Sequence, residues 1–143
     1  MPVAYCDAAP VQTLESGKPS VLILDDNFLF RDLLKQIFVD AGFSVIAVGD
    51  AATALRTLVE HDFDLLIADI MLCDDLSNID GREVVLAAKR INTKTRVIIC
   101  SAYIGMLEEI MKDPKMLPFD EILSKGGFKV KDLIDVAKRL VQK

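Results

Sequence analysis

Short apolar runs that recur along this chain limit what it can fold into more than any other feature. Four of them lie at residues 21–24, 45–48, 65–68 and 97–100. Each has the length of a β-strand and is too short for a helix. Three are almost unbroken by polar residues, as a strand buried on both faces requires, and such strands occur where helices cover both faces of a parallel sheet. A fifth run, at residues 119–123, is interrupted by two acids and suits the edge of the sheet.

Between these runs the apolar period changes from two residues to about 3.6, which indicates amphipathic helices. The expected helical stripes are residues 30–38, 51–58, 84–91, 104–111 and 133–141. Gly42 is the expected end of the first helix, Asp50 the N-cap of the second, and Asp80 with Glu83 a capping box for the third. Strand and helix thus alternate five times. Because strand-helix-strand crossovers are right-handed, we predict an α/β protein with a doubly wound parallel sheet and helices on both faces.

The charge balance and the hydropathy narrow the choice of partners. The chain has 143 residues, with 17 Lys and Arg against 22 Asp and Glu, which gives a net charge of −5. This acidic balance argues against direct binding of nucleic acid backbones. No apolar stretch approaches the ~18 residues of a membrane span, and the start of the chain lacks the pattern of a signal peptide. We therefore expect a cytoplasmic protein without membrane insertion.

The beginning of the chain differs in character from the rest. Residues 1–19 contain three prolines after Met1 and one glycine, with no sustained apolar period. Such a segment is typical of an irregular N-terminal extension that lies outside the core. A single domain over residues 20–143 is then the simplest organisation.

Residues capable of chemistry collect where the apolar runs end. Asp25 and Asp26 follow the first run, Asp69 follows the third, and Ser101 and Lys125 mark the ends of the fourth and fifth. Because the carboxyl ends of parallel strands meet at one edge of the sheet, where ligands bind in such folds, we expect these five residues to lie close together. Asp and Lys favour loops in general. That preference explains any one of these positions, but it does not explain all five.

Three carboxylates beside one ammonium group need a further source of positive charge. Two like charges about 4 Å apart repel by roughly 4 kcal/mol at an effective dielectric of 20. A site with few carboxylates and room for water and phosphate oxygens suits Mg²⁺ better than Ca²⁺ or Zn²⁺. The remaining carboxylate can then act as a nucleophile toward phosphorus. The cation and Lys125 would neutralise the oxygens of the transferred group, and Ser101 would donate a hydrogen bond to one of them.

These residues resemble those of the bacterial response regulator receiver domain of two-component systems. The matching pieces, within residues 20–143, are Leu24-Asp25-Asp26-Asn27, Asp69 after a buried strand, Ile79-Asp80-Gly81 at the third helix, Ser101-Ala102 and Lys125. The resemblance implies a flavodoxin-like fold with strand order 2-1-3-4-5. It also implies a signalling domain that catalyses only its own phosphorylation and dephosphorylation. Because no output domain follows the last helix in this sequence, we expect a single-domain regulator that acts through a downstream protein.

The resemblance also assigns a role to each residue of the site. Asp69 would accept a phosphoryl group from a histidine of a sensor histidine kinase or a histidine phosphotransfer protein. Lys125 would pair with the phosphoryl oxygens, and Ser101 would move toward them. The implied Mg²⁺ ligands are Asp26 directly, Asp25 through a water molecule, Asp69, and the backbone carbonyl of Met71.

Three features depart from the family pattern. Residues 73–78 make the loop after Asp69 roughly four residues longer than usual, which a surface loop tolerates thermodynamically. Gly126 and Gly127 follow Lys125 where the family has a proline after a cis peptide bond. A cis bond without proline costs about 3 kcal/mol, so we expect either a trans bond there or a visibly strained one. Ile122 stands where many relatives have an aromatic residue, which argues against an aromatic switch.

Two other functions remain open. An aspartyl-nucleophile phosphatase of the haloacid dehalogenase type needs the pattern D-x-D at a strand end, but Asp69 is followed by Ile70 and Met71. Asp25 and Asp26 are followed by Asn27 and also lack this pattern. A degenerate receiver would bind a partner without being phosphorylated, and the long loop and the missing proline and aromatic residue keep that reading open.

Overall fold

The computed structural model describes residues 12–70, 81–102, 112 and 117–142, and its strands and helices alternate as the sequence predicts. The elements are β1 (Ser20–Leu24), α2 (Phe28–Asp40), β2 (Ser44–Val48), α3 (Ala51–Glu60), β3 (Leu65–Asp69), α4 (Gly81–Ile91), β4 (Arg96–Ser101), β5 (Glu121–Ser124) and α6 (Val130–Val141). All four strand pairings are parallel, and the order is β2-β1-β3-β4-β5. The predicted fold and strand order are confirmed.

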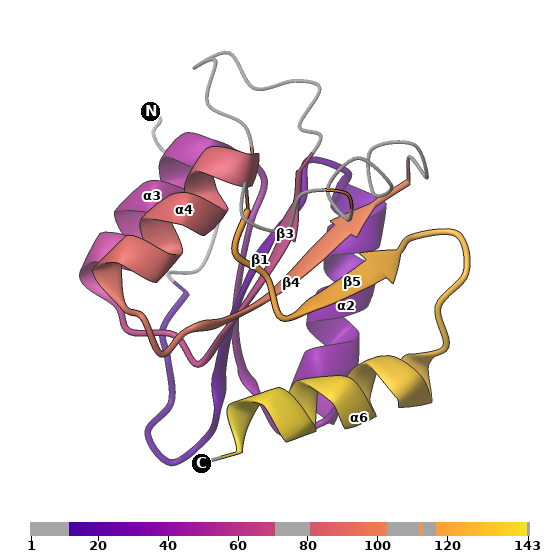
Figure 1. Cartoon of the computed structure of the whole chain (residues 1–143). Coiled ribbons are helices and arrows are strands. Elements are labelled where there is room, and N and C mark those ends of the chain that lie inside the picture. Colours follow the sequence, from indigo (N-terminus) through magenta and orange to yellow (C-terminus); the bar gives the residue numbers. More distant parts are fainter. Residues whose placement is uncertain (1–11, 71–80, 103–111, 113–116, 143) are drawn as a thin grey trace, which may run out of the picture.

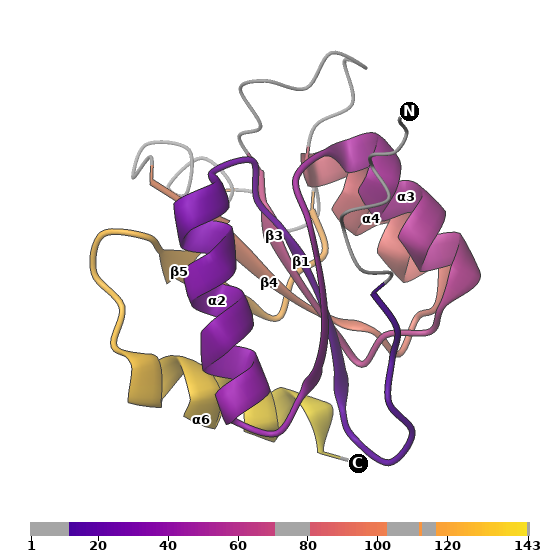
Figure 2. The same ribbon diagram turned by 180° about the vertical axis from the view of Figure 1, so that it is seen from behind.

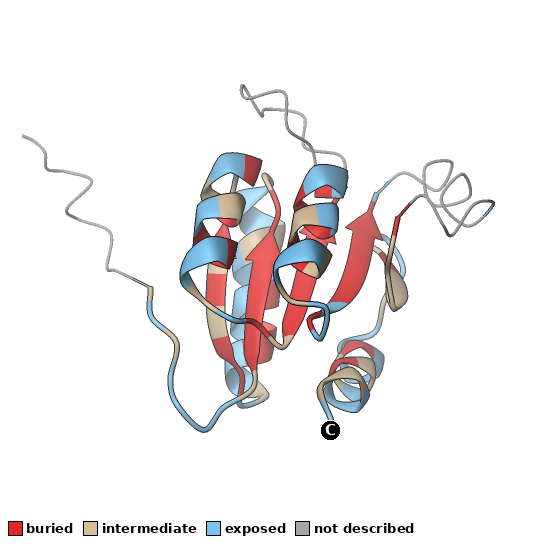
Figure 3. Cartoon of the chain, turned by 60° about the vertical axis from the view of Figure 1, so that its left-hand side comes forward, coloured by how far each residue is buried: buried red, intermediate tan, exposed pale blue. Residues whose placement is uncertain are grey.

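Helices cover both faces of the sheet. Figures 1 and 2 show α3 and α4 on one face and α2 and α6 on the other. Side chains of β1 alternate between these faces: Leu22 and Leu24 pack in the core under α3 and α4, whereas Val21 and Ile23 pack in the core under α2 and α6. All four are fully buried, and the central strands are buried along their length in Figure 3. This two-sided burial explains why the runs are almost free of polar residues.

Local signals place the helix ends next to the strand ends. The side chain of Asn27 caps α2 by accepting a hydrogen bond from the backbone N–H of Phe30 at 3.1 Å. The side chain of Asp50, the predicted N-cap, caps α3 by accepting a hydrogen bond from the backbone N–H of Thr53. After α2, Gly42 adopts a φ of 92°, a conformation that favours glycine and ends the helix. The first helix therefore begins directly after the two acids that follow β1.

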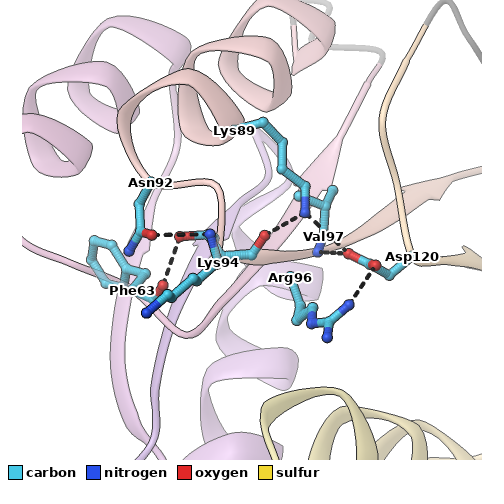
Figure 4. Close-up of polar contacts among 8 residues, drawn as sticks. Phe63, Lys89, Asn92, Lys94, Arg96, Val97 and Asp120 are labelled. Carbon is cyan, nitrogen blue, oxygen red and sulfur yellow. Dashed lines mark hydrogen bonds and ion pairs between the residues drawn. The ribbon is translucent and has the colours of Figure 1, made fainter. Parts of the chain in front are cut away.

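The fifth strand begins later than the sequence predicts. The expected strand covered residues 119–123, but β5 starts at Glu121. The Asp120 carboxylate accepts a hydrogen bond from the backbone N–H of Val97 at 2.8 Å, in the place of a backbone acceptor from a longer strand. It also pairs with Lys89 at 3.5 Å and Arg96 at 3.2 Å (Figure 4). These contacts lie at the amino ends of β4 and β5, at the opposite end of the sheet from the carboxyl ends of the strands.

The described part of the N-terminal extension packs on the outer strand of the sheet. The Gln12 side chain donates to the backbone carbonyl of Ala47 at 3.0 Å and accepts from its N–H at 2.8 Å. The backbone N–H of Glu15 donates to the Ser44 hydroxyl, and Leu14 packs against the core under α3 and α4. Within the described residues 12–19, the contacts with β2 and with this core come from Gln12, Leu14 and Glu15, whereas residues 16–18 are exposed.

Some expectations fall on residues that the structure does not describe. They are the helix at residues 104–111, the capping residue Asp80 and the long loop at residues 73–78. None of the helices in the described part of the chain is long and apolar enough to cross a membrane.

Candidate functional site

The carboxyl ends of the strands bring the predicted site residues that the structure describes to one end of the sheet. The strands β4 and β5 point toward this end at the upper right of Figure 1. Asp25 directly follows β1, and Asp69 is the last residue of β3. Ser101 ends β4 and is fully buried. In the β3–β4 register Asp69 lies opposite Cys100, so Ser101 is one position further along the neighbouring strand. The backbone N–H of Lys125 donates a hydrogen bond to the backbone carbonyl of Ser101 at 3.1 Å. This bond fixes the start of the β5–α6 connection against β4.

The ammonium group of Lys125 bridges two of the acids. Its Nζ lies 2.7 Å from Oδ2 of Asp69 and 2.8 Å from Oδ2 of Asp25. The side chains of Asp69 and Asp25 are only 5% and 0% exposed, and that of Lys125 is 14% exposed. Salt screens such buried pairs much less than surface pairs. One cation is therefore held between two acids that come from different strands.

The third acid joins the same cluster. One carboxylate oxygen from each of Asp25, Asp26 and Asp69 lies within 4.8 Å of the others. Oδ1 of Asp25 accepts a hydrogen bond from the backbone N–H of Asn27 at 2.9 Å. Its buried Oδ2 is paired with the Lys125 ammonium group at 2.8 Å and has no further partner among the described residues. A carboxylate oxygen can accept more than one such contact, so this buried oxygen retains acceptor capacity.

Burial and charge act in opposite directions on Lys125. Burial lowers its pKa, but the hydrogen bonds and negative charges of Asp25 and Asp69 outweigh burial, so the pKa of Lys125 is raised above its ordinary value. Lys125 therefore stays protonated at neutral pH. Cys100 lies opposite Asp69 on the neighbouring strand. Burial raises the pKa of its thiol, and the negative charges of Asp69 and Asp25 raise it further. A protonated, fully buried thiol is a packing residue rather than a nucleophile.

Two backbone features of the site need particular residues. Gly81 starts α4 directly beside β3, and a Cβ atom there would overlap the carbonyl oxygen of Asp69 and come within 2.8 Å of the Cα of Ile70. Only glycine fits this close approach.

Arg31 donates a hydrogen bond through Nη1 to the backbone carbonyl oxygen of Asp25 at 2.8 Å. Its guanidinium group also occupies the space that a side chain at Gly49 would take.

Sequence reasoning missed the role of Arg31, and it also missed Phe30. Both lie on α2, where Phe30 appeared only as one member of an apolar stripe. The available signal was weak: Arg31 is a cation within a mostly apolar helix that begins right after the two acids. Met71, predicted to offer a backbone carbonyl, lies outside the described residues. The Lys125–Gly126 bond is trans, as predicted, since no cis peptide bond occurs in the described ranges.

Comparison with known proteins identifies the family. The model of the response regulator receiver domain matches residues 21–137. The chemotaxis protein CheY of Bacillus subtilis is 35% identical over 83 residues, which cover 57% of this chain and 66% of CheY. Sporulation initiation phosphotransferase F of the same species is 29% identical over 96 residues, 67% of this chain and 73% of that protein. The DNA-binding transcriptional regulator NtrC of Azospirillum brasilense is 28% identical over 120 residues, but this match spans only 24% of NtrC.

Solved structures give the same result. A response regulator receiver protein from Sinorhizobium medicae superposes with a TM-score of 0.76 at 25% identity, covering 89% of this chain and 97% of that one. The receiver domain of a Pseudomonas aeruginosa sensor histidine kinase, with a magnesium ion coordinated in its active site cleft, superposes with a TM-score of 0.73. It covers 87% of this chain and 98% of that one, and at 18% identity it shows the shared fold alone. From the family match, the sheet order and these relatives, the chain belongs to the response regulator receiver domain family of two-component signalling.

Proposed function

We propose that Asp69 accepts a phosphoryl group from a histidine of a sensor histidine kinase or a histidine phosphotransfer protein, in a reaction that depends on Mg²⁺. The observation that carries this proposal is the position of the Lys125 ammonium group, which lies 2.7 Å from Asp69 and 2.8 Å from Asp25. An acceptor carboxylate, a cation for the transferred group and two further acids thus lie together in one cluster.

The residues present fit a magnesium ion. The three carboxylates carry three negative charges and Lys125 returns one positive charge, so the cluster keeps an excess of two. All the side-chain donors are hard oxygen atoms, with no histidine or thiolate directed at them among the described residues, which is the donor set of Mg²⁺ rather than of Zn²⁺. The buried Oδ2 of Asp25, whose one partner among the described residues is Lys125, retains acceptor capacity for a ligand or for its water shell. When bound, Mg²⁺ neutralises charge on the phosphoryl oxygens.

The chain's own groups supply the remaining chemistry. A carboxylate oxygen of Asp69 forms the new bond to phosphorus while the bond from phosphorus to the histidine nitrogen breaks, and that nitrogen keeps the electron pair. Lys125 already contacts Asp69, so it can pair with the phosphoryl oxygens after a small movement. The hydroxyl of Ser101 is the donor that we assign to another of those oxygens. Asp26 and Asp25 hold the cation.

The signal then leaves through protein contacts. We assign the chain a histidine kinase or phosphotransfer protein as the donor and a protein as the downstream target, without direct binding of nucleic acid. Its catalysis would be limited to its own phosphorylation and dephosphorylation.

Incubation with Mg²⁺ and acetyl phosphate, followed by intact mass measurement, tests the proposal. The expected result is the added mass of one phosphoryl group, lost in Asp69→Asn and in the absence of Mg²⁺. The matched control is Asp135→Asn, which removes an exposed acid from α6 and should leave the adduct in place. No adduct on the wild type, together with no Mg²⁺ binding, favours the degenerate receiver. Sustained turnover of a phosphomonoester favours the phosphatase.

A further inference from the structure

An aromatic ring covers the ammonium group of Lys125 in the site. The Nζ atom lies over the ring of Phe30, 4.9 Å from its centroid. Phe30 comes from the first turn of α2, whereas Lys125 follows β5, so the contact joins two elements far apart in the sequence. A cation within about 6 Å of a ring centroid is attracted to the negative face of the ring. Lys125 therefore contacts two carboxylates and an aromatic face.

A second ring holds the first in place. Phe128 meets Phe30 edge to face, with the centroids 5.9 Å apart and the rings at 81°. Phe128 stands three residues after Lys125, beyond the exposed Gly126 and Gly127. A Cβ atom at either glycine would meet open space, so no side chain at these two positions holds the turn between Lys125 and Phe128. The Phe30–Phe128 contact consequently anchors the far end of this turn to α2.

We propose that Phe30, supported by Phe128, is a positioning residue that keeps the Lys125 ammonium group directed into the site while its partner changes from the Asp69 carboxylate to the transferred phosphoryl group. This inference rests on the proposed function above. When Asp69 forms its bond to phosphorus, the contact at 2.7 Å between Asp69 and Lys125 has to be replaced by one to a phosphoryl oxygen. A lysine side chain with many rotamers would otherwise turn toward water at that step, since 14% of it is already exposed.

The contact itself can be measured without any phosphorylation. Protons on the side chain of Lys125 that lie over the Phe30 ring should have NMR signals shifted upfield by its ring current. Phe30→Leu keeps an apolar side chain of similar size but has no ring, and it should move these signals back toward ordinary lysine values. Phe30→Tyr keeps the ring and should retain the upfield shift.

The consequence for the reaction is a change in rate. With acetyl phosphate below saturation and Mg²⁺ in excess, Phe30→Leu should be phosphorylated about fivefold more slowly than wild type, which is the size expected for loss of one partly desolvated cation–π contact. Phe30→Tyr should restore the rate to within twofold. The matched control is Phe28→Leu, the same substitution at a ring on the same turn of α2 that is 60% exposed. It should leave both the rate and the Lys125 signals unchanged.

Each result decides a different point. The inference is overturned if Phe30→Leu reacts as fast as Phe28→Leu, if Phe30→Tyr is as slow as Phe30→Leu, or if the Lys125 signals do not respond to loss of the ring. If the wild type takes up no phosphoryl group, the proposed function itself fails and the role of Phe30 in phosphorylation fails with it. A wild type that is phosphorylated normally, with no effect of Phe30→Leu, overturns the inference alone.

Discussion

At the scale of single residues, Lys125 balances part of the negative charge of the site. It is the cation placed between Asp25 and Asp69, and both acids are almost completely buried. Removing one partner from a buried ion pair leaves an uncompensated charge, which costs more than the pair itself contributes. Loss of the Lys125 ammonium group would leave three neighbouring carboxylates without this cation.

We predict that Lys125→Gln lowers the free energy of unfolding by about 2–3 kcal/mol in the absence of divalent cations, with part of the loss recovered in Mg²⁺. Urea unfolding monitored by circular dichroism measures both values. Lys129→Gln, which changes an exposed lysine nearby, should cost less than about 0.5 kcal/mol. Equal effects of the two substitutions would contradict the importance of the ion pair. Because the pKa of Lys125 is raised by folding, its contribution is fully present below about pH 10.4 and declines as the pH rises from there through the raised pKa, so the difference between wild type and Lys125→Gln should shrink at higher pH.

Gly81 shows how the backbone around Asp69 depends on the absence of one side chain. A Cβ atom at this position would overlap the Asp69 carbonyl, so α4 could not begin where it does. We predict that Gly81→Ala lowers the free energy of unfolding by about 2 kcal/mol and weakens Mg²⁺ binding, because the backbone of Asp69 must shift. Gly126→Ala is the control, since its Cβ would meet open space. Isothermal titration with Mg²⁺ and urea unfolding supply the readouts, and an unperturbed Gly81→Ala protein would exclude this packing argument.

At the scale of elements, the edge of β2 has an unexpected partner. A primary amide carries a donor and an acceptor side by side, and the Gln12 side chain uses both on the backbone of Ala47, in the way that a neighbouring strand would. The two groups of Ala47 point away from β1 because β1 and β2 are parallel and pair through alternate residues. Exposed strand edges are sites of unwanted pairing, and this contact occupies part of one.

We predict that Gln12→Ala speeds hydrogen exchange at the Ala47 amide by about fivefold and lowers the free energy of unfolding by about 1 kcal/mol, the usual contribution of a hydrogen bond in a protein. Gln36→Ala is a suitable control because Gln36 is an exposed amide on α2 that bonds only to the side chain of Asp40 among the described residues. Exchange measured by NMR at residue resolution gives the result. Unchanged protection of Ala47 would show that the segment does not rest on β2 in solution.

Element boundaries show where sequence reasoning succeeds. β1 and β3 were located within a residue because burial on both faces forces an unbroken apolar run, which is visible in the sequence alone. The predicted start of β5 is wrong because the Asp120 side chain takes the place of a backbone acceptor. No pattern in the sequence indicates such a replacement. The same limit applies to Gln12 and Phe30, whose contacts depend on how two distant segments meet.

At the scale of the whole molecule, the sheet order brings residues that are scattered in the sequence into one cluster. Acids separated by more than forty positions, Asp25 and Asp69, meet because β1 and β3 are neighbours and parallel. This part of the site was predictable, since carboxyl ends of parallel strands share an edge. The ion pairs of Lys125, the cover provided by Phe30 and the contact of Arg31 with Asp25 were not, because they depend on side-chain conformations at the meeting point of three elements.

The central claim is that Asp69, among all the acids gathered at this edge, receives the phosphoryl group. Treating the phosphorylated protein with borohydride reduces an aspartyl phosphate to homoserine, and peptide mass spectrometry then locates the changed residue. We predict homoserine at position 69 and at no other position, with none formed when acetyl phosphate is omitted. Homoserine at position 25 or 26 instead of 69, or none in a protein that has gained a phosphoryl group, would contradict the account.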